Sequence, residues 1–125
     1  MSHGERFKSA VTHIETALAG LADRASPDYR NSIKESISAV EAMCQIITGD
    51  PKATLAKALK QIGVHSALEA GFIKIYGYTS DGDGIRHALS NEAAVGADDA
   101  KFFLVACSAF VNYLIAKSAT AIINK

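Results

Sequence analysis

The sequence predicts an all-α protein, a single helical bundle of about five helices plus one short helical turn. Apolar residues recur at three- and four-residue steps, which is the period of an amphipathic helix. No segment alternates with period two for long, and residues that cap or stop helices are spaced at helical lengths. With 125 residues, 49% of them hydrophobic, residues 1–125 have the length and apolar content of one domain.

The first predicted helix covers residues 5–24. Its apolar positions alternate four- and three-residue steps, as expected for a helix with one face against a partner. They are Phe7, Val11, Ile14, Leu18 and Leu21.

A second helix is predicted to begin at Ser26, Pro27 and Asp28. Serine can cap free backbone donors, proline suits the first helical position, and aspartate complements the positive end of the helix dipole. Gly49 ends this helix, because glycine adopts the left-handed terminal conformation without a side-chain clash. The apolar stripe consists of Ile33, Ile37, Val40, Cys44 and Ile47.

Two shorter helices follow. We expect the third to restart at Asp50 and Pro51 and to end at Gly63. Ser66 and Glu69 have the spacing of a capping box for the fourth, which is expected to end near Gly77. Residues 78–84 then indicate a loop and residues 85–89 a short helical turn.

The last helix is predicted to open at Asp98 or Asp99 and to run to about residue 123. Its apolar surface is broader than a single packed stripe requires. A helix that is centrally buried, or shared with a second subunit, would explain this breadth. The second of these two explanations corresponds to a homodimer. The apolar residues are Phe102, Phe103, Ala106, Ala109, Phe110, Tyr113 and Leu114.

Charge and composition narrow the functional class. Thirteen Lys and Arg balance thirteen Asp and Glu, so the chain lacks the basic excess of a dedicated nucleic-acid binder, and any RNA contact must be local. The sequence has no phosphate-binding glycine loop, no clustered Cys and His and no nucleophile elbow, so we expect neither a metal nor a cofactor. Cys44 and Cys107 occupy apolar helical positions, which predicts buried, reduced thiols.

Two sequence features predict the cellular compartment. The apolar stretch at 102–115 is interrupted by polar residues and is shorter than the ~20 residues of a membrane span. The first eight residues have no apolar core or cleavage site of a signal peptide. These observations predict a cytoplasmic protein without a membrane segment.

The best candidate site is Arg86 and His87, which follow a loop containing two aspartates and two glycines. Arginine can bind phosphate, and histidine can exchange protons near neutral pH. Neighbouring residues on a helix point about 100° apart, so the two would flank a ligand. The alternative interpretation is a surface arginine beside a histidine used for helix packing.

Two further features are candidates for binding. Arg30, Lys34, Ser38 and Glu41 form a polar strip on the second predicted helix, with Glu35 on the adjoining side; such strips are commonly solvated faces. Tyr78, with Tyr76, could stack on a base next to Arg86 and His87, or close the core at a helix end.

Several segments together resemble the helical C-terminal domain of abortive-infection-like bacterial proteins, a branch of the HEPN superfamily. The resemblance covers about residues 28–113. It rests on residues 30–41 (RNSIKESISAVE), 55–59, 76–81 (YGYTSD), 84–88 (GIRHA) and 99–102 (DAKF).

The resemblance implies a dimeric helical domain in phage defence or a toxin–antitoxin system, with RNA or a nucleotide as ligand. Relatives usually carry an additional N-terminal region. The resemblance therefore implies either a single HEPN-like domain or a C-terminal fragment of a longer protein. Its partner would be an additional N-terminal domain or an antitoxin. Many family members are metal-independent ribonucleases, and others are binding modules without catalysis.

The family's active pattern places an Arg five to seven positions before its His, and His87 matches that His. The corresponding upstream positions here hold Ser80, Asp81 and Gly82. This favours a catalytically degenerate binding module.

The alternative is a ribonuclease. His87 would then exchange the proton of the RNA 2′-hydroxyl and Arg86 would hold the phosphate. Asp81, Glu35 and Glu41 would orient these two groups.

Overall fold

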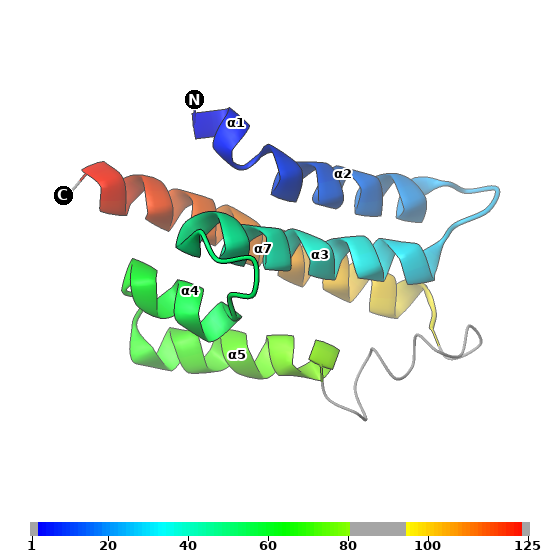
Figure 1. Cartoon of the computed structure of the whole chain (residues 1–125). Helices are drawn as coiled ribbons and strands as arrows, with labels where there is room; N and C mark the ends of the chain where they lie inside the picture. The colour runs from blue at the N-terminus through cyan, green and yellow to red at the C-terminus, as the bar shows by residue number, and fades with distance from the viewer. Residues whose placement is uncertain (1–2, 81–94, 124–125) are drawn as a thin grey trace.

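A computed structural model describes residues 3–80 and 95–123 of the chain. Five helices of eight residues or more and one four-residue helix make up most of this part, and no strand occurs among the described residues. The longer helices lie alongside one another in a bundle (Figure 1). The prediction of an all-α helical bundle is confirmed.

The first predicted helix is two helices, α1 (His3–Arg6) and α2 (Lys8–Ala22). The break falls at Phe7, whose φ of −103° and ψ of 10° depart from helical values. The Phe7 side chain is buried in the core. The expectation of one continuous helix over residues 5–24 is therefore wrong, and the break coincides with burial of this ring.

The buried face of α2 also differs from the predicted stripe. Val11 and Leu18 are 40% and 54% exposed, whereas Ala10 and Ala17 are fully buried. The reason is close packing against the next helix, where the Ser32 hydroxyl donates to the Ala17 carbonyl at 2.7 Å. Small residues permit this approach, and larger side chains are displaced to the outer face.

The next helix, α3 (Tyr29–Thr48), begins at Asp28, whose carboxylate accepts from the Asn31 N–H at 3.1 Å. Ser26 was expected as the cap, but Asp23 holds the N–H of Ser26 and the chain enters the helix two residues later. Gly49 ends the helix in the left-handed conformation, with a φ of 71°, as predicted.

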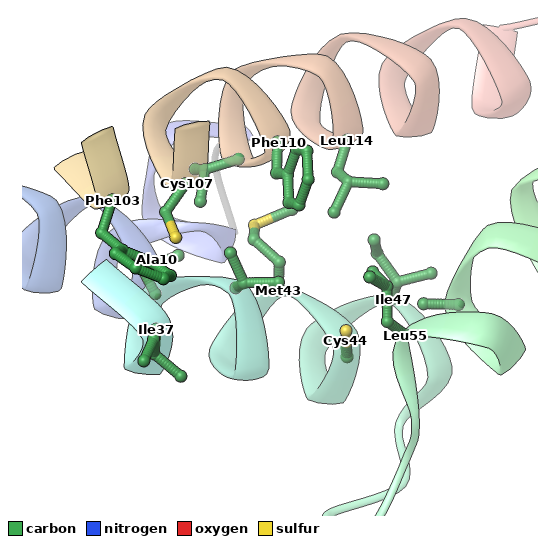
Figure 2. Packing of buried hydrophobic residues seen from close by; sticks show 14 of the residues in the cluster. Ala10, Ile37, Met43, Cys44, Ile47, Leu55, Phe103, Cys107, Phe110 and Leu114 are labelled. Carbon is green, nitrogen blue, oxygen red and sulfur yellow. The ribbon is translucent and has the colours of Figure 1, made fainter. Parts of the chain in front are cut away.

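α3 is the central helix, since α2, α4 and α7 all pack against it. Figure 2 shows Met43 reaching toward Phe110 of α7, whereas Cys44 lies beside Leu55 on another side of α3. Every residue of the predicted α3 stripe is buried, together with four further residues of the same helix. These buried residues are Ser32, Ile33, Ser36, Ile37, Ala39, Val40, Met43, Cys44 and Ile47.

The short helix α4 (Leu55–Ile62) begins later than expected. The Thr54 side chain caps it by accepting from the Lys57 N–H at 3.2 Å. Asp50 instead stabilises the preceding turn, accepting from the Lys52 N–H and from the Lys57 ammonium group. Gly63 ends α4 with a φ of 84°, as predicted.

The fourth long segment, α5 (Ser66–Ser80), extends past its predicted end. His65 rather than Ser66 caps it, because the His65 Nδ1 atom accepts from the Ala67 N–H at 3.0 Å. The helix continues through Gly77, so residues 78–80 are helical and not part of a loop. The remainder of the predicted loop and the turn at 85–89 lie outside the described residues.

The last helix, α7 (Ala97–Ile123), is close to the predicted one. Its inner face, which includes Phe103, Cys107, Phe110 and Leu114, is buried against the rest of the bundle (Figure 2). Among the described residues, the stretch Ala97–Ser118 is the one long and apolar enough to cross a membrane, by length and composition alone. A core helix of a soluble protein meets the same criterion.

Candidate functional site

Four of the seven predicted site residues lie in the described part of the chain. Arg30, Glu35 and Glu41 are on α3, and Tyr78 is on α5. Asp81, Arg86 and His87 lie outside the described residues, so their role as a catalytic group stays a prediction. The described four do not converge on one site.

Glu41 lines a cavity of about 400 Å³ between α3, the start of α4 and α5. Cys44 lies one turn further along α3, and the other walls are residues 53–56 and, from α5, Ile73, Tyr76 and Gly77. The site thus combines one carboxylate, a tyrosine and a mainly aliphatic wall.

The carboxylate of Glu41 affects the pKa of the neighbouring Cys44 thiol. Burial, together with a smaller effect of the nearby Glu41 carboxylate, raises the pKa of the Cys44 thiol to about 11, against a still smaller lowering by a backbone hydrogen bond. A thiol with such a pKa remains protonated at neutral pH and is a poor nucleophile. Cys44 is therefore part of the wall and not a reactive group.

Arg30 lies on nearly the same face of α3 as Glu41, but eleven residues earlier, which is about 16 Å along a helix axis. It lines a separate, smaller pocket of about 310 Å³ with Asp28, Tyr29 and Val95, among other residues. Val95 immediately precedes α7. Arg30 and Glu41 therefore mark two different recesses along one side of α3.

Glu35 faces a different neighbour. Its carboxylate contacts the His13 Nδ1 atom of α2 at 2.5 Å. Six residues separate it from Glu41, which places the two about 120° apart around the helix. Glu35 joins α3 to α2 and does not reach the cavity that Glu41 lines.

Tyr78 packs its ring on Phe103 of α7, with centroids 5.8 Å apart and planes at 21°. The side chain remains 45% exposed. Phe102 meets the same Phe103 ring edge-on at 5.4 Å. Tyr78 therefore belongs to an aromatic group at the α5–α7 boundary that is open to solvent.

Sequence reasoning missed the contribution of α4 to the cavity. Because Asp50 and Pro51 were expected to open the helix, residues 53–56 were treated as helical interior. The signal was Thr54, a preferred cap residue directly before an apolar run. In the described part of the chain, no group of three or more His, Cys, Asp or Glu side chains could hold a metal ion.

Comparison of the chain with protein-family models, with curated proteins and with solved structures finds no match. The HEPN resemblance thus rests on the sequence segments alone. Function has to be argued from the exposed surfaces and the recesses of the bundle.

Proposed function

We propose that this chain is a cytoplasmic, HEPN-like helical module that forms homodimers through α7 and binds RNA or a nucleotide. The sequence resemblance supports a phage-defence or toxin–antitoxin setting. The absence of an Arg five to seven residues before His87 supports binding without catalysis. The single structural observation behind the dimer is the outer face of α7.

That face carries apolar side chains that the bundle does not cover. Phe102 and Val105 are 50% and 69% exposed, and Ala109 and Asn112 are exposed after them. The steps between these four residues are three, four and three, which is the spacing of a seam between two packed helices. An apolar seam open to water on a helix that is also a core element favours a protein partner.

A second copy of this chain is the partner that this seam fits best. Small Ala109 allows the two helices to approach closely, and the polar Asn112 within the seam can fix their register by pairing with its equivalent. A stable dimer buries roughly 800 Å² on each partner. The α7 seam spans only about 15 Å from residue 102 to 112, so we expect the adjacent exposed side chains of α5, including Tyr78, to complete the contact.

Sedimentation velocity of two matched variants tests the dimer. Val105→Lys places a charge in the seam, and we expect it to weaken self-association at least tenfold because a buried unpaired ammonium group is unfavourable. Val11→Lys, at an exposed position on α2, is the control and should leave association unchanged. A chain that is monomeric at high concentration, or a dimer broken by Val11→Lys alone, would exclude this interface.

Incubating the chain with RNA in the presence of a chelator distinguishes RNA binding from RNA cleavage. We expect a retarded band in native electrophoresis and intact RNA in a denaturing gel. Metal-independent cleavage by the wild type that disappears in His87→Ala would replace the binding module with the ribonuclease alternative.

A further inference from the structure

The cavity between α3, α4 and α5 has walls suited to a single planar heterocycle. We propose that it binds a guanine base, with the Glu41 carboxylate accepting hydrogen bonds from the base N1–H and 2-amino groups. This inference rests on the proposed function and deepens it, because it names the part of the RNA or nucleotide that the module recognises.

The size and lining of the cavity support a base-sized ligand. A volume of about 400 Å³ lies at the lower end of the range for small-molecule sites, which is roughly 300–1,000 Å³. Leu55 and Ile73 provide aliphatic surface and Tyr76 provides an aromatic ring. Such walls cover the faces of a flat ring, and a few polar groups then select its edge.

The carboxylate selects guanine among the four bases. An ionised carboxylate only accepts hydrogen bonds. Guanine presents two neighbouring donors, N1–H and the 2-amino group, whereas adenine and cytosine place an acceptor beside their amino group and uracil has one donor between two acceptors. An acceptor opposed to the carboxylate would be left without a partner, which costs affinity.

Glu41 also interacts within the chain. The two oxygens of a carboxylate offer about four lone-pair sites, so this interaction and a bound base can be accommodated together. Glu41 lies one turn from Cys44 on α3, and Tyr76 and Gly77 of α5 line the same cavity. A base entering between α3 and α5 would meet the carboxylate with its edge.

The charge of the cavity indicates where the phosphate would lie. None of the described residues that line it is a Lys or Arg. A phosphate inside would be repelled by Glu41, so it must remain outside while the base enters. Guanosine and its monophosphate are therefore expected to bind with similar affinity, within about threefold, which is unlike a phosphate-centred site.

Titration of the full chain with nucleosides, followed by NMR line shifts of the tyrosine rings, tests the selection. We expect guanosine to bind at least tenfold more tightly than inosine, which lacks only the 2-amino donor, and more tightly than adenosine. Equal affinity for guanosine and inosine, or no shift of the tyrosine ring signals on addition of guanosine, would overturn the proposal.

Two variants locate the interaction. Glu41→Gln replaces two acceptors by one acceptor and one donor, so it should weaken guanosine at least tenfold and strengthen adenosine. Ala56→Leu fills the cavity and should abolish binding of both nucleosides, whereas Ala19→Leu on the exposed face of α2 should change neither. A folded Ala56→Leu variant, checked by circular dichroism, that still binds guanosine would place the base elsewhere and exclude this site.

The source of the guanine is distinguished by two RNA oligomers that differ at one position. If the module reads RNA, a single-stranded oligomer with one guanine should bind more tightly than guanosine alone and lose affinity when that guanine becomes inosine. Guanosine binding with no added affinity for the oligomer supports the pocket but counts against an RNA-binding module. RNA binding that does not change when the guanine becomes inosine supports an RNA-binding module but counts against the guanine pocket. The two failures are therefore distinguishable.

Discussion

The two longest helices of the bundle, α3 with 20 residues and α7 with 27, use their apolar side chains differently. No large apolar residue of α3 is exposed, because α2, α4 and α7 pack around it. In α7 the inner face is equally well buried, but Phe102 and Val105 face solvent. Figure 1 shows α3 between neighbours on several sides.

This difference separates apolar residues that stabilise the chain from those available to a partner. Folding of the single chain removes all of the large apolar side chains of α3 from full exposure to solvent. It accounts for only one face of α7, and the remaining seam has the spacing of a helix–helix contact. The comparison of α3 and α7 thus predicts which substitutions reduce stability and which reduce association.

The largest expected effect comes from two adjacent phenylalanines in α7. Phe103 is 2% exposed, and Phe103→Ala should lower the free energy of unfolding by about 3–5 kcal/mol, because it removes a buried ring and leaves a cavity. Phe102→Ala should cost less than about 1 kcal/mol in the monomer but weaken self-association. Urea denaturation at low protein concentration measures the first effect and sedimentation the second.

The pair is its own control, since both variants make the same chemical change one residue apart. Similar losses of monomer stability would mean that the outer face of α7 is covered within the chain. The distinction between the two faces, and with it the proposed dimer seam, would then have to be abandoned.

The next effect concerns alkaline pH. Burial raises the pKa of Cys107 in α7 to about 12 and, with Glu41, that of Cys44 in α3 to about 11. A folded pKa above the unfolded value means that the thiol contributes stability fully below about pH 9, and that this is lost as pH rises through the folded pKa. For Cys107, whose pKa rises from 9.0 to about 12, the full loss is on the order of 4 kcal/mol.

Urea unfolding between pH 8 and 11 measures this contribution. Tyrosines and lysines titrate in the same range, so the informative quantity is the difference between the wild type and each alanine variant. Cys107→Ala should reduce the loss of unfolding free energy with rising pH more than Cys44→Ala does, because the α7 thiol faces the core and the α3 thiol lines a cavity. Identical slopes for all three chains would show that neither thiol is protected from solvent.

Most of the fold could be predicted from periodicity and capping signals, and the errors have physical causes. The α3 stripe was correct because large aliphatic residues occur there on the face that packs. The α2 stripe failed at Val11 and Leu18, because the tight α2–α3 contact selects Ala10 and Ala17, and side-chain size at a contact does not follow from hydrophobicity alone. α5 passes through Gly77, where a tertiary contact of Tyr78 outweighs the helix-breaking tendency of glycine.

The candidate site was less predictable. Glu41 was selected as part of a polar strip, but the strip could not show that Glu35 would pair with His13 on another side of the helix. Cavities arise from how separate helices fit together, so the approach of residues 53–56 and Tyr76 to Glu41 has no local sequence signature. The chemistry assigned to Arg86 and His87 rests on their residue types and on the family resemblance, and both residues lie outside the described part of the chain.

The smallest effect tests the start of α3, where Ser26 was the predicted cap and Asp28 is the cap in the structure. The Asp28 carboxylate accepts from the Asn31 N–H at 3.1 Å, so Asp28→Ala should lower the free energy of unfolding by about 1 kcal/mol. Ser26→Ala should change it by only a few tenths of a kcal/mol, because Ser26 lies in the preceding link. Thermal unfolding of the two variants side by side measures the difference. A larger loss for Ser26→Ala would mean that the helix begins at the residue the sequence pattern favoured, with Asp28 inside its first turn.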